Sequence, residues 1–261
     1  MAIYKHMSLW RNVPGFRTIN RLINKRLGDS IYTEAFDKTF HSPLGLGPGM
    51  DHQGGWINDL SALGFGFLGI DTQGADLDLL TSRLSRKRPE ALISCEILSS
   101  GSSAESMARS VIRTFTLLYD FTDFFTISTK PQAGMYSLND ISDLSDLLDE
   151  LLGIRLCYEQ YRPIVLRLSA NVTGQELEQM LAFCRLSGID AVSVPGKSLV
   201  EKVVRLTDGR LPVIASGLGK DPQEALDMLR SGATLLEMDK SVPLNAARSF
   251  NKLLAKSKKT L

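Results

Sequence analysis

Short apolar runs recur along the chain at intervals that suit a parallel β-sheet. Eight of them have the length of a buried strand, and longer segments with helical spacing of apolar residues separate them. Strands that are apolar at successive positions are typical of parallel sheets covered by helices. The runs comprise residues 44–46, 65–70, 91–97, 124–128, 164–168, 191–194, 213–215 and 235–238.

Glycines and capping residues mark the ends of the intervening helices. The stretches SALGFGFLGI, CRLSGIDAVSV and MLRSGATLLEM each pass from a helical pattern through a glycine into an apolar run. Glycine adopts the left-handed conformation that closes a helix at little cost. Capping patterns predict three helix starts, at Asp221 with Pro222 and Glu224, at Thr173 with Glu176, and at Ser102 with Glu105.

This alternation predicts an α/β fold, a (β/α)8 TIM barrel. Seven intervening segments and a last helix near residues 244–254 complete the eightfold count. A doubly wound open sheet is the alternative, but no G-x-G-x-x-G stretch opens a helix. No composition break divides the chain. We therefore expect an N-terminal amphipathic helical extension over residues 1–39 and one barrel domain over residues 40–261.

Composition restricts the class of protein and its partners. Of the 261 residues, 43% are hydrophobic and 23% are charged, which is typical of a globular protein. Thirty basic and 29 acidic residues give a net charge of +1, so no overall charge favours nucleic acid. The three cysteines lie far apart without metal-ligand spacing, which argues against a zinc site or a disulfide framework. We expect a cytoplasmic protein without a membrane-spanning segment.

The N-terminal region is basic and amphipathic. Residues 5–28 contain six Lys or Arg residues and no acid, and Ile19, Leu22, Ile23 and Arg26 have helical spacing. Such a helix can lie on an anionic membrane surface, which would make the protein peripheral at the inner face of the membrane. The alternative is a helix packed on the surface of its own domain.

Polar residues follow most of the predicted strands, where barrels place their active sites. In LPVIASGLGKDPQEAL a buried strand runs into a turn of small residues and then into a capped helix, an arrangement that presents backbone amides to a phosphate. Gly217 and Gly219 lie in this turn, and Lys240 and Ser241 follow the next strand. A phosphate-bearing ligand is one interpretation, and a tight turn without a ligand is the other.

The stretch SPLGLGPGMDHQGGWINDLSALGFGFLGIDT resembles the dihydroorotate dehydrogenases, particularly their membrane-associated, quinone-using class. The order of the segments RPIVLRLSANVT, SGIDAVSV and LPVIASGLGKDPQEALDMLRSGATLLEM is similar as well, so the resemblance covers most of residues 40–255. It implies a barrel that binds FMN, a base that removes a proton from dihydroorotate, and a place in pyrimidine biosynthesis. It further implies a small-molecule substrate, a quinone partner and an N-terminal helical extension at the membrane.

The resemblance assigns a role to individual residues of this chain. Thr129 takes the position of the catalytic base, with Lys130 next to it. His52 and Lys197 fall at substrate-binding positions. The positions expected around FMN are Gly47, Gly49, Thr72, Arg167, Gly217, Gly219, Lys240 and Ser241.

Most departures from the family pattern fall on the chemistry. His52 replaces a lysine, Arg167 replaces another, and Thr126 and Pro131 stand where the family has substrate-binding asparagines. Lost amide partners leave buried polar groups of the substrate unpaired, at about 1 to 3 kcal/mol each. The expected function is FMN-dependent oxidation of dihydroorotate or a related molecule, altered or lost. The alternatives are a non-catalytic paralogue with an interaction or regulatory role, and a flavin-free barrel enzyme acting on a phosphorylated metabolite.

Overall fold

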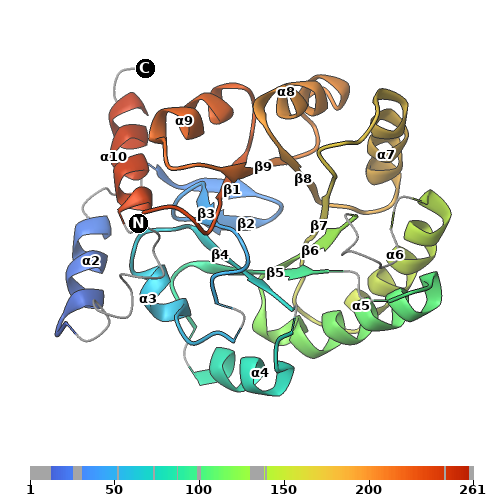
Figure 1. Cartoon of the computed structure of the whole chain (residues 1–261), viewed down its shortest axis with the longest axis horizontal. Helices are drawn as coiled ribbons and strands as arrows, with labels where there is room; N and C mark the ends of the chain where they lie inside the picture. Colours follow the sequence, from blue (N-terminus) through green and yellow to red (C-terminus); the bar gives the residue numbers. More distant parts are fainter. Residues whose placement is uncertain are drawn as a thin grey trace.

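Eight parallel strands form a closed barrel in the computed structural model, which describes residues 13–25, 31–51, 53–72, 74–86, 88–98, 101–129, 138, 140–243 and 245–258 (Figure 1). The order around the barrel is β10-β3-β4-β5-β6-β7-β8-β9. The strands are β3 (Leu44–Leu46), β4 (Phe67–Asp71), β5 (Leu92–Ile97), β6 (Phe124–Ser128), β7 (Ile164–Arg167), β8 (Ala191–Pro195), β9 (Val213–Leu218) and β10 (Leu235–Met238). The predicted TIM barrel is confirmed, and each predicted apolar run overlaps one of these strands.

Helices lie outside the barrel between the strands (Figure 1). They are α3 (Ile57–Ser61), α4 (Leu77–Arg86), α5 (Ala104–Leu118), α6 (Ile141–Leu156), α7 (Gly174–Leu186), α8 (Lys197–Leu206), α9 (Pro222–Arg230) and α10 (Ala246–Lys258). Cys95, Cys157 and Cys184 are free thiols.

Two of the three predicted caps are confirmed. Thr173 forms a capping box with Glu176, and Asp221 caps α9 by accepting from the amide of Gln223. The third was placed one residue too early, because Ser103 rather than Ser102 caps α5. Glycines with positive φ (Gly64, Gly188 and Gly232) stand at the three helix-to-strand junctions read from the sequence.

A β-hairpin closes the N-terminal end of the barrel. It consists of β1 (Thr33–Ala35) and β2 (Lys38–Phe40), with Phe36 and Asp37 at positive φ in the turn. Phe40 packs edge-on against Phe67 and Phe124, which are buried inside the barrel. Part of the extension expected to be helical is therefore a hairpin, because alternate side chains of these two short strands fill the barrel end. The domain boundary after residue 39 stays a prediction.

Helix α2 (Phe16–Lys25) is the described part of the basic N-terminal region, and it is attached to the barrel mainly by polar contacts. Arg17 Nε lies 2.5 Å from Asp59 Oδ1, Arg21 Nε lies 3.1 Å from Glu90 Oε1, and Asn24 donates to the carbonyl of Ala62 at 2.9 Å. Phe16 is buried, whereas Ile19 and Leu22 are 54% and 58% exposed. The helix packs on its own domain, and part of its apolar face lies outward. None of the helices within the described ranges is long and apolar enough to cross a membrane.

Candidate functional site

Arg167 stands at the C-terminal end of the barrel between two glutamates. Its Nε lies 2.6 Å from Glu96 Oε1 on β5, and its Nη2 donates to Glu237 Oε2 on β10 at 2.9 Å. Both glutamates are buried. Burial alone would lower the pKa of Arg167, but the charges of Glu237 and Glu96 raise it above its ordinary value. Arg167, Glu96 and Glu237 are called the ion triad below.

The barrel interior changes from apolar to charged along the strands. Phenylalanine and aliphatic side chains fill its N-terminal end. Side chains two positions apart on a strand point to the same face of the sheet, so the residues two positions after these apolar ones also point into the barrel and form the next interior layer. This layer includes the buried hydroxyl residues Ser94, Thr126 and Ser193, and Ser94 Oγ lies 3.4 Å from Thr126 Oγ1. In the strand register, Arg167 pairs with Ser193 and Glu96 pairs with Thr126, so the ion triad lies level with these small hydroxyl side chains.

The predicted catalytic position is enclosed by backbone. The Thr129 side chain donates through Oγ1 to the carbonyl of Arg167 at 3.0 Å, and the Thr129 amide donates to the same carbonyl at 3.0 Å. Only 3% of Thr129 is exposed. A hydroxyl that donates to a carbonyl from a buried position is poorly placed to take a proton from a substrate. Lys130 and His52 lie outside the described residues.

The glycine-rich stretch of the first strand packs against the protein's own atoms. Gly47 donates to the carbonyl of Met238 at 2.8 Å, and a Cβ at Gly47 would lie 3.0 Å from that oxygen and 3.1 Å from Glu237 Oε1. A Cβ at Gly69 would lie 2.7 Å from the nitrogen of Pro48. Gly49 has φ 93°, which favours glycine. Neighbouring strands approach this stretch so closely that little room is left for side chains.

Asp51, which follows this stretch, organises the loop before α3. Its carboxylate accepts from the amides of Gly55 at 2.8 Å and Trp56 at 2.6 Å. Burial raises the pKa of Asp51, against the lowering effect of these hydrogen bonds. Its carboxylate is thus already used within the protein.

The loops after β9 and β10 meet, as the phosphate interpretation requires. The amide of Asp239 donates to the carbonyl of Leu218 at 3.0 Å, and Gly217, Lys240 and Ser241 are exposed. However, the Ser241 amide donates to the carboxylate of Asp239 at 2.8 Å. A Cβ at Gly219 would lie 3.5 Å from Glu224 Oε2. The loops bring the four predicted residues together, with carboxylates beside the amides.

Two further predicted site residues, Thr72 and Lys197, have described contacts only with residues close to them in the sequence. The carbonyl of Thr72, just after β4, accepts from the amide of Ala75 at 3.3 Å. Lys197 is exposed at the start of α8, with Nζ 3.7 Å from Glu201 Oε1 on the same helix. The structure does not bring Lys197 to the ion triad.

Glu237 is the main site residue that sequence reasoning missed. Strand β10 reads LLEM, a buried strand with one acid. The signal was available, because a glutamate inside an otherwise apolar barrel strand needs a charged partner. Glu96 lies within the predicted apolar run 91–97, and its pairing with Arg167 was not predicted. Within the described ranges, no group of three His, Cys, Asp or Glu residues is placed to hold a metal ion.

Three of the contacts that the sequence resemblance assigns to FMN are occupied by the protein's own groups. Arg167 is engaged by two carboxylates, the Ser241 amide is engaged by Asp239, and the backbone at Gly47 is covered by β10. The mouth of the barrel is thus organised by contacts within the chain.

Comparisons with known proteins identify relatives along most of the chain. No protein-family model matches it. A curated protein named dihydroorotate dehydrogenase (quinone) from Cellvibrio japonicus is 22% identical over 270 residues, covering 78% of this chain and 79% of the relative. One of the same name from Chloroflexus aurantiacus is 25% identical over 298 residues, covering 84% and 81%.

Structural similarity leads to the same group of proteins. The crystal structure of dihydroorotate dehydrogenase from Eimeria tenella in complex with ferulenol has a TM-score of 0.76 to this chain at 15% identity, covering 97% of this chain and 93% of that one. At this identity the likeness establishes the fold, and the sequence matches establish the relationship. The chain is a divergent relative of the dihydroorotate dehydrogenases (quinone), as the resemblance in its sequence implies.

Proposed function

We propose that the chain is a dihydroorotate dehydrogenase-like barrel of the quinone class that has lost the oxidation of dihydroorotate and acts as a non-catalytic paralogue. The observation that carries this proposal is the ion triad. A group that accepts hydride gains negative charge, and a nearby cation stabilises that charge. Arg167 offers no net positive charge, because Glu96 and Glu237 both contact it.

The proton-abstraction side of the reaction supports the same proposal. Thr129 stands where the resemblance expects the base, but its hydroxyl is buried and donates to the carbonyl of Arg167. Deprotonated, the hydroxyl would lose this hydrogen bond and face a carbonyl oxygen. That arrangement disfavours the alkoxide that a base would require.

The N-terminal region retains features suited to a membrane surface. Ile19 and Leu22 on α2 are exposed, and Tyr32 beyond the helix is 47% exposed, while Arg17 and Arg21 are paired with Asp59 and Glu90. Exposed apolar residues on one face of a helix suit the boundary of a bilayer. We infer a peripheral location at such a membrane, which the names of the quinone-using relatives support.

A cavity of about 750 Å³ lies beside α2 and is the candidate place for a quinone or another apolar partner. Leu22, Ile31 and Tyr32 supply its apolar lining. Several of its polar groups already have partners, since Asn24 donates to Ala62 and Asn251 donates to Gly64. Other lining residues, such as Ser61 and Glu90, precede the barrel strands, so the cavity lies toward the N-terminal end, away from Arg167.

The names of the relatives favour a second candidate function, FMN-dependent oxidation of dihydroorotate or a related small molecule. The two candidates differ in a direct assay. The purified full chain is mixed with FMN, dihydroorotate and a short-chain quinone, and reduction of the quinone is followed by absorbance.

The non-catalytic proposal predicts no dihydroorotate-dependent reduction above a protein-free control. A dehydrogenase of the same class, assayed in parallel, verifies that the reagents are competent. Quinone reduction by the full chain that depends on dihydroorotate would reject the proposal in favour of the second candidate.

A further inference from the structure

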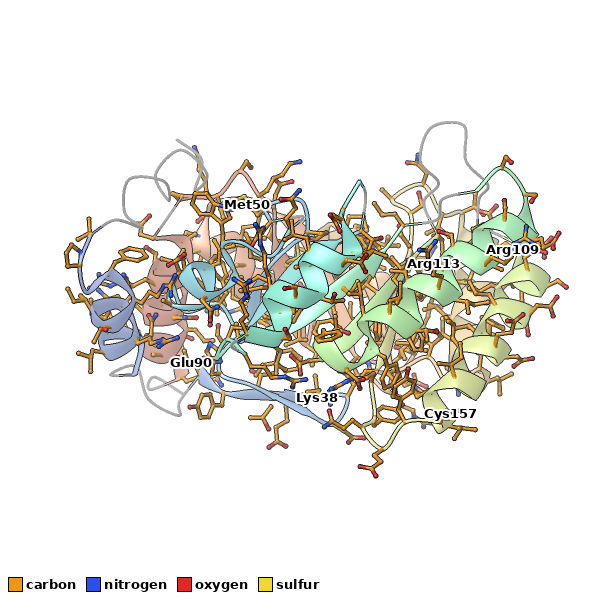
Figure 2. The ribbon with its side chains drawn as sticks, turned by 90° about the horizontal axis from the view of Figure 1, so that it is seen from below. Lys38, Met50, Glu90, Arg109, Arg113 and Cys157 are labelled. Carbon is orange, nitrogen blue, oxygen red and sulfur yellow. The ribbon has the colours of Figure 1, made fainter. Side chains whose placement is uncertain are left out.

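The cavity beside α2 is lined by two polar side chains, His41 and Ser61, that keep hydrogen-bonding capacity for a ligand. His41 precedes β3, and Ser61 is the last residue of α3. The cavity has a volume of about 750 Å³. Figure 2 shows Glu90, another residue of its lining, on the side of Lys38 and opposite Met50, which lies in the glycine-rich stretch at the mouth. The cavity is therefore separate from the ion triad.

Ser61 retains a hydroxyl proton for a partner in the cavity. Its Oγ accepts from the amide of Glu90 at 3.1 Å and from that of Ala91 at 3.0 Å, so both of its lone pairs are engaged. Only 3% of Ser61 is exposed. Among the residues that the structure describes, none accepts a hydrogen bond from this hydroxyl. A buried donor of this kind is normally satisfied by a water molecule or a ligand.

His41 supplies a hydrogen-bond acceptor. Burial lowers the pKa of His41, whereas a hydrogen bond with the backbone of Phe65 and the charge of Glu90 raise it. A hydrogen bond that raises the pKa of a histidine is one that the ring donates, so one ring nitrogen carries the proton that faces Phe65. In the neutral imidazole the other ring nitrogen has a lone pair and accepts. His41 therefore complements the donor of Ser61.

The two polar groups are held by the same short turn. The amide of Gly64 donates to the carbonyl of Ser61 at 3.2 Å, which closes the turn after α3. Phe65, the backbone partner of His41, is the next residue after Gly64. An acceptor nitrogen and a donor hydroxyl are thus positioned by one turn, and both line the same cavity.

The rest of the lining suits an uncharged, largely apolar molecule. Its two charged side chains pair with each other, since Arg21 Nε lies 3.1 Å from Glu90 Oε1, and together they carry no net charge. Ile31 is buried, whereas Leu22 and Tyr32 are 58% and 47% exposed. A ligand can therefore place its polar end against the buried turn and its apolar body along these three side chains.

We propose that this cavity binds an uncharged amphiphile whose apolar body ends in a hydroxyl group, such as an alkylphenol, and that this hydroxyl donates to His41 and accepts from Ser61. The inference rests on the proposed role of the cavity as the place for an apolar partner. A hydroxyl group donates and accepts at once, so it satisfies both side chains. A quinone carbonyl only accepts, and it would leave the His41 nitrogen without a donor.

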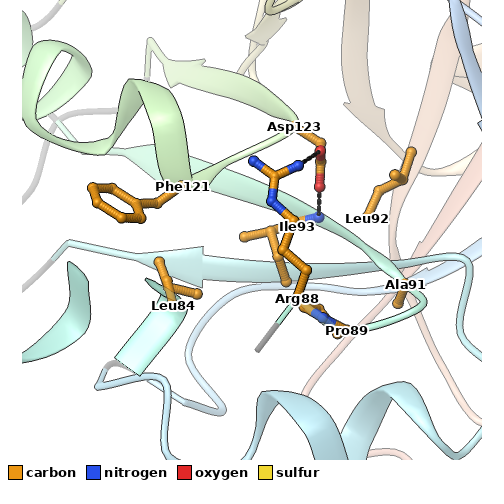
Figure 3. A pocket seen from close by; sticks show the side chains of 8 residues that line it. All are labelled: Leu84, Arg88, Pro89, Ala91, Leu92, Ile93, Phe121 and Asp123. Carbon is orange, nitrogen blue, oxygen red and sulfur yellow. Dashed lines mark hydrogen bonds and ion pairs between the residues drawn. The ribbon is translucent and has the colours of Figure 1, made fainter. Parts of the chain in front are cut away.

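A second cavity, at the same end of the barrel, supplies a control. It has a volume of about 90 Å³ and is lined by apolar side chains together with Arg88 and Asp123 (Figure 3). Asp123 Oδ2 accepts from the Ile93 amide at 2.8 Å, and its Oδ1 lies 3.5 Å from Arg88 Nη1. Because a water molecule takes up about 30 Å³ in the liquid, this cavity has room for only a few heavy atoms. An alkylphenol does not fit it, so Arg88→Gln is a control variant.

The test compares two probes that differ by one hydrogen-bond donor. Para-butylphenol and its methyl ether, para-butylanisole, have the same ring and chain, but only the phenol can donate. Calorimetric titration of the purified full chain, without FMN, dihydroorotate or quinone, measures both dissociation constants. We expect the phenol to bind about tenfold more tightly than the ether. His41→Phe should abolish this difference, whereas Tyr32→Phe and Arg88→Gln should retain it.

The outcomes separate this proposal from the proposed function. Equal affinities of the phenol and the ether for the unmodified protein would overturn the hydroxyl proposal and leave the cavity as the place for an apolar partner. Saturable binding of neither probe would overturn both. A preference for the phenol that persists in His41→Phe would overturn the role of His41. None of these results depends on dihydroorotate oxidation, which the quinone-reduction assay tests by itself.

Discussion

Glu237 accepts a hydrogen bond from Arg167 at 2.9 Å, although the two residues are 70 positions apart in the chain. Together with Glu96, which lies 2.6 Å from the same guanidinium, Glu237 makes Arg167 part of the internal structure of the barrel. We therefore expect Arg167 to contribute mainly to the stability of the fold. The effect of replacing it on the free energy of unfolding should be measurable without any ligand.

Arg167→Met should destabilise the fold strongly. The substitution leaves Glu96 and Glu237 buried without their cation, and breaking a buried pair in this way costs about 3 to 5 kcal/mol. Urea denaturation measures the free energy of unfolding. The matched control replaces all three charges, as Arg167→Met with Glu96→Gln and Glu237→Gln, and should recover most of the loss. A loss below about 1 kcal/mol for Arg167→Met alone would contradict the role of the ion triad.

Gly47→Ala should destabilise the barrel by about 1 to 3 kcal/mol, because the added methyl group would lie 3.0 Å from the Met238 carbonyl oxygen. Gly153→Ala is the matched control. It lies within α6 with no atom within 4 Å of its added Cβ, so it should stabilise the protein by about 0.5 to 1 kcal/mol. Thermal or urea unfolding gives both values. Equal effects of the two substitutions would show that β10 does not restrict Gly47.

Acidification below about pH 6.5 should weaken the fold in part through His41. Burial lowers the pKa of His41, against the effects of a backbone hydrogen bond with Phe65 and of the Glu90 charge. The folded state therefore favours the neutral imidazole. Its contribution to stability is present above the unfolded-state pKa of 6.5 and is lost as pH falls toward the folded-state value.

Urea unfolding at about pH 7.5 and about pH 5 should thus show a smaller loss of stability for His41→Gln than for the unmodified protein. Because each protein is compared with itself at the two pH values, any effect of the substitution that does not depend on pH cancels. An identical pH dependence in the two proteins would exclude His41 as a contributor.

The exposed residues of α2 should carry any binding to anionic vesicles. Ile19→Ser combined with Leu22→Ser should lower partitioning by at least about tenfold, since each lost apolar side chain removes about 1.5 to 3 kcal/mol of burial. Leu156→Ser with Leu186→Ser is the control, because these leucines are 87% and 89% exposed at the ends of α6 and α7. Co-sedimentation with vesicles measures the partitioning. Equal losses from both pairs would remove α2 as the membrane contact.

Much of the fold could be predicted from local patterns in the sequence. Buried parallel strands are apolar at successive positions, and the glycines at 64, 188 and 232 mark helix ends through a backbone conformation that few other residues adopt. The hairpin at residues 33–40 was missed because its strands are three residues long. So short a segment gives no clear periodicity, and its stability comes from Phe40 inside the barrel.

The candidate site could be predicted only in outline. The resemblance identified Arg167 as a site residue, but its pairing with Glu96 and Glu237 depends on the closure of the barrel, which places β5 and β10 on either side of Arg167. The resemblance placed two glycines of the first-strand segment, Gly47 and Gly49, next to a bound ligand. Sequence could not distinguish this from close packing against β10, because both require a residue without a side chain.

Titration of the purified protein with FMN, followed by quenching of flavin fluorescence, tests most directly whether the mouth of this barrel has lost the chemistry of its relatives. The ion triad predicts no saturable quenching at micromolar FMN and a colourless purified protein. Stoichiometric, saturable binding of FMN, followed by bleaching of the flavin bands when dihydroorotate is added without oxygen, would contradict the account.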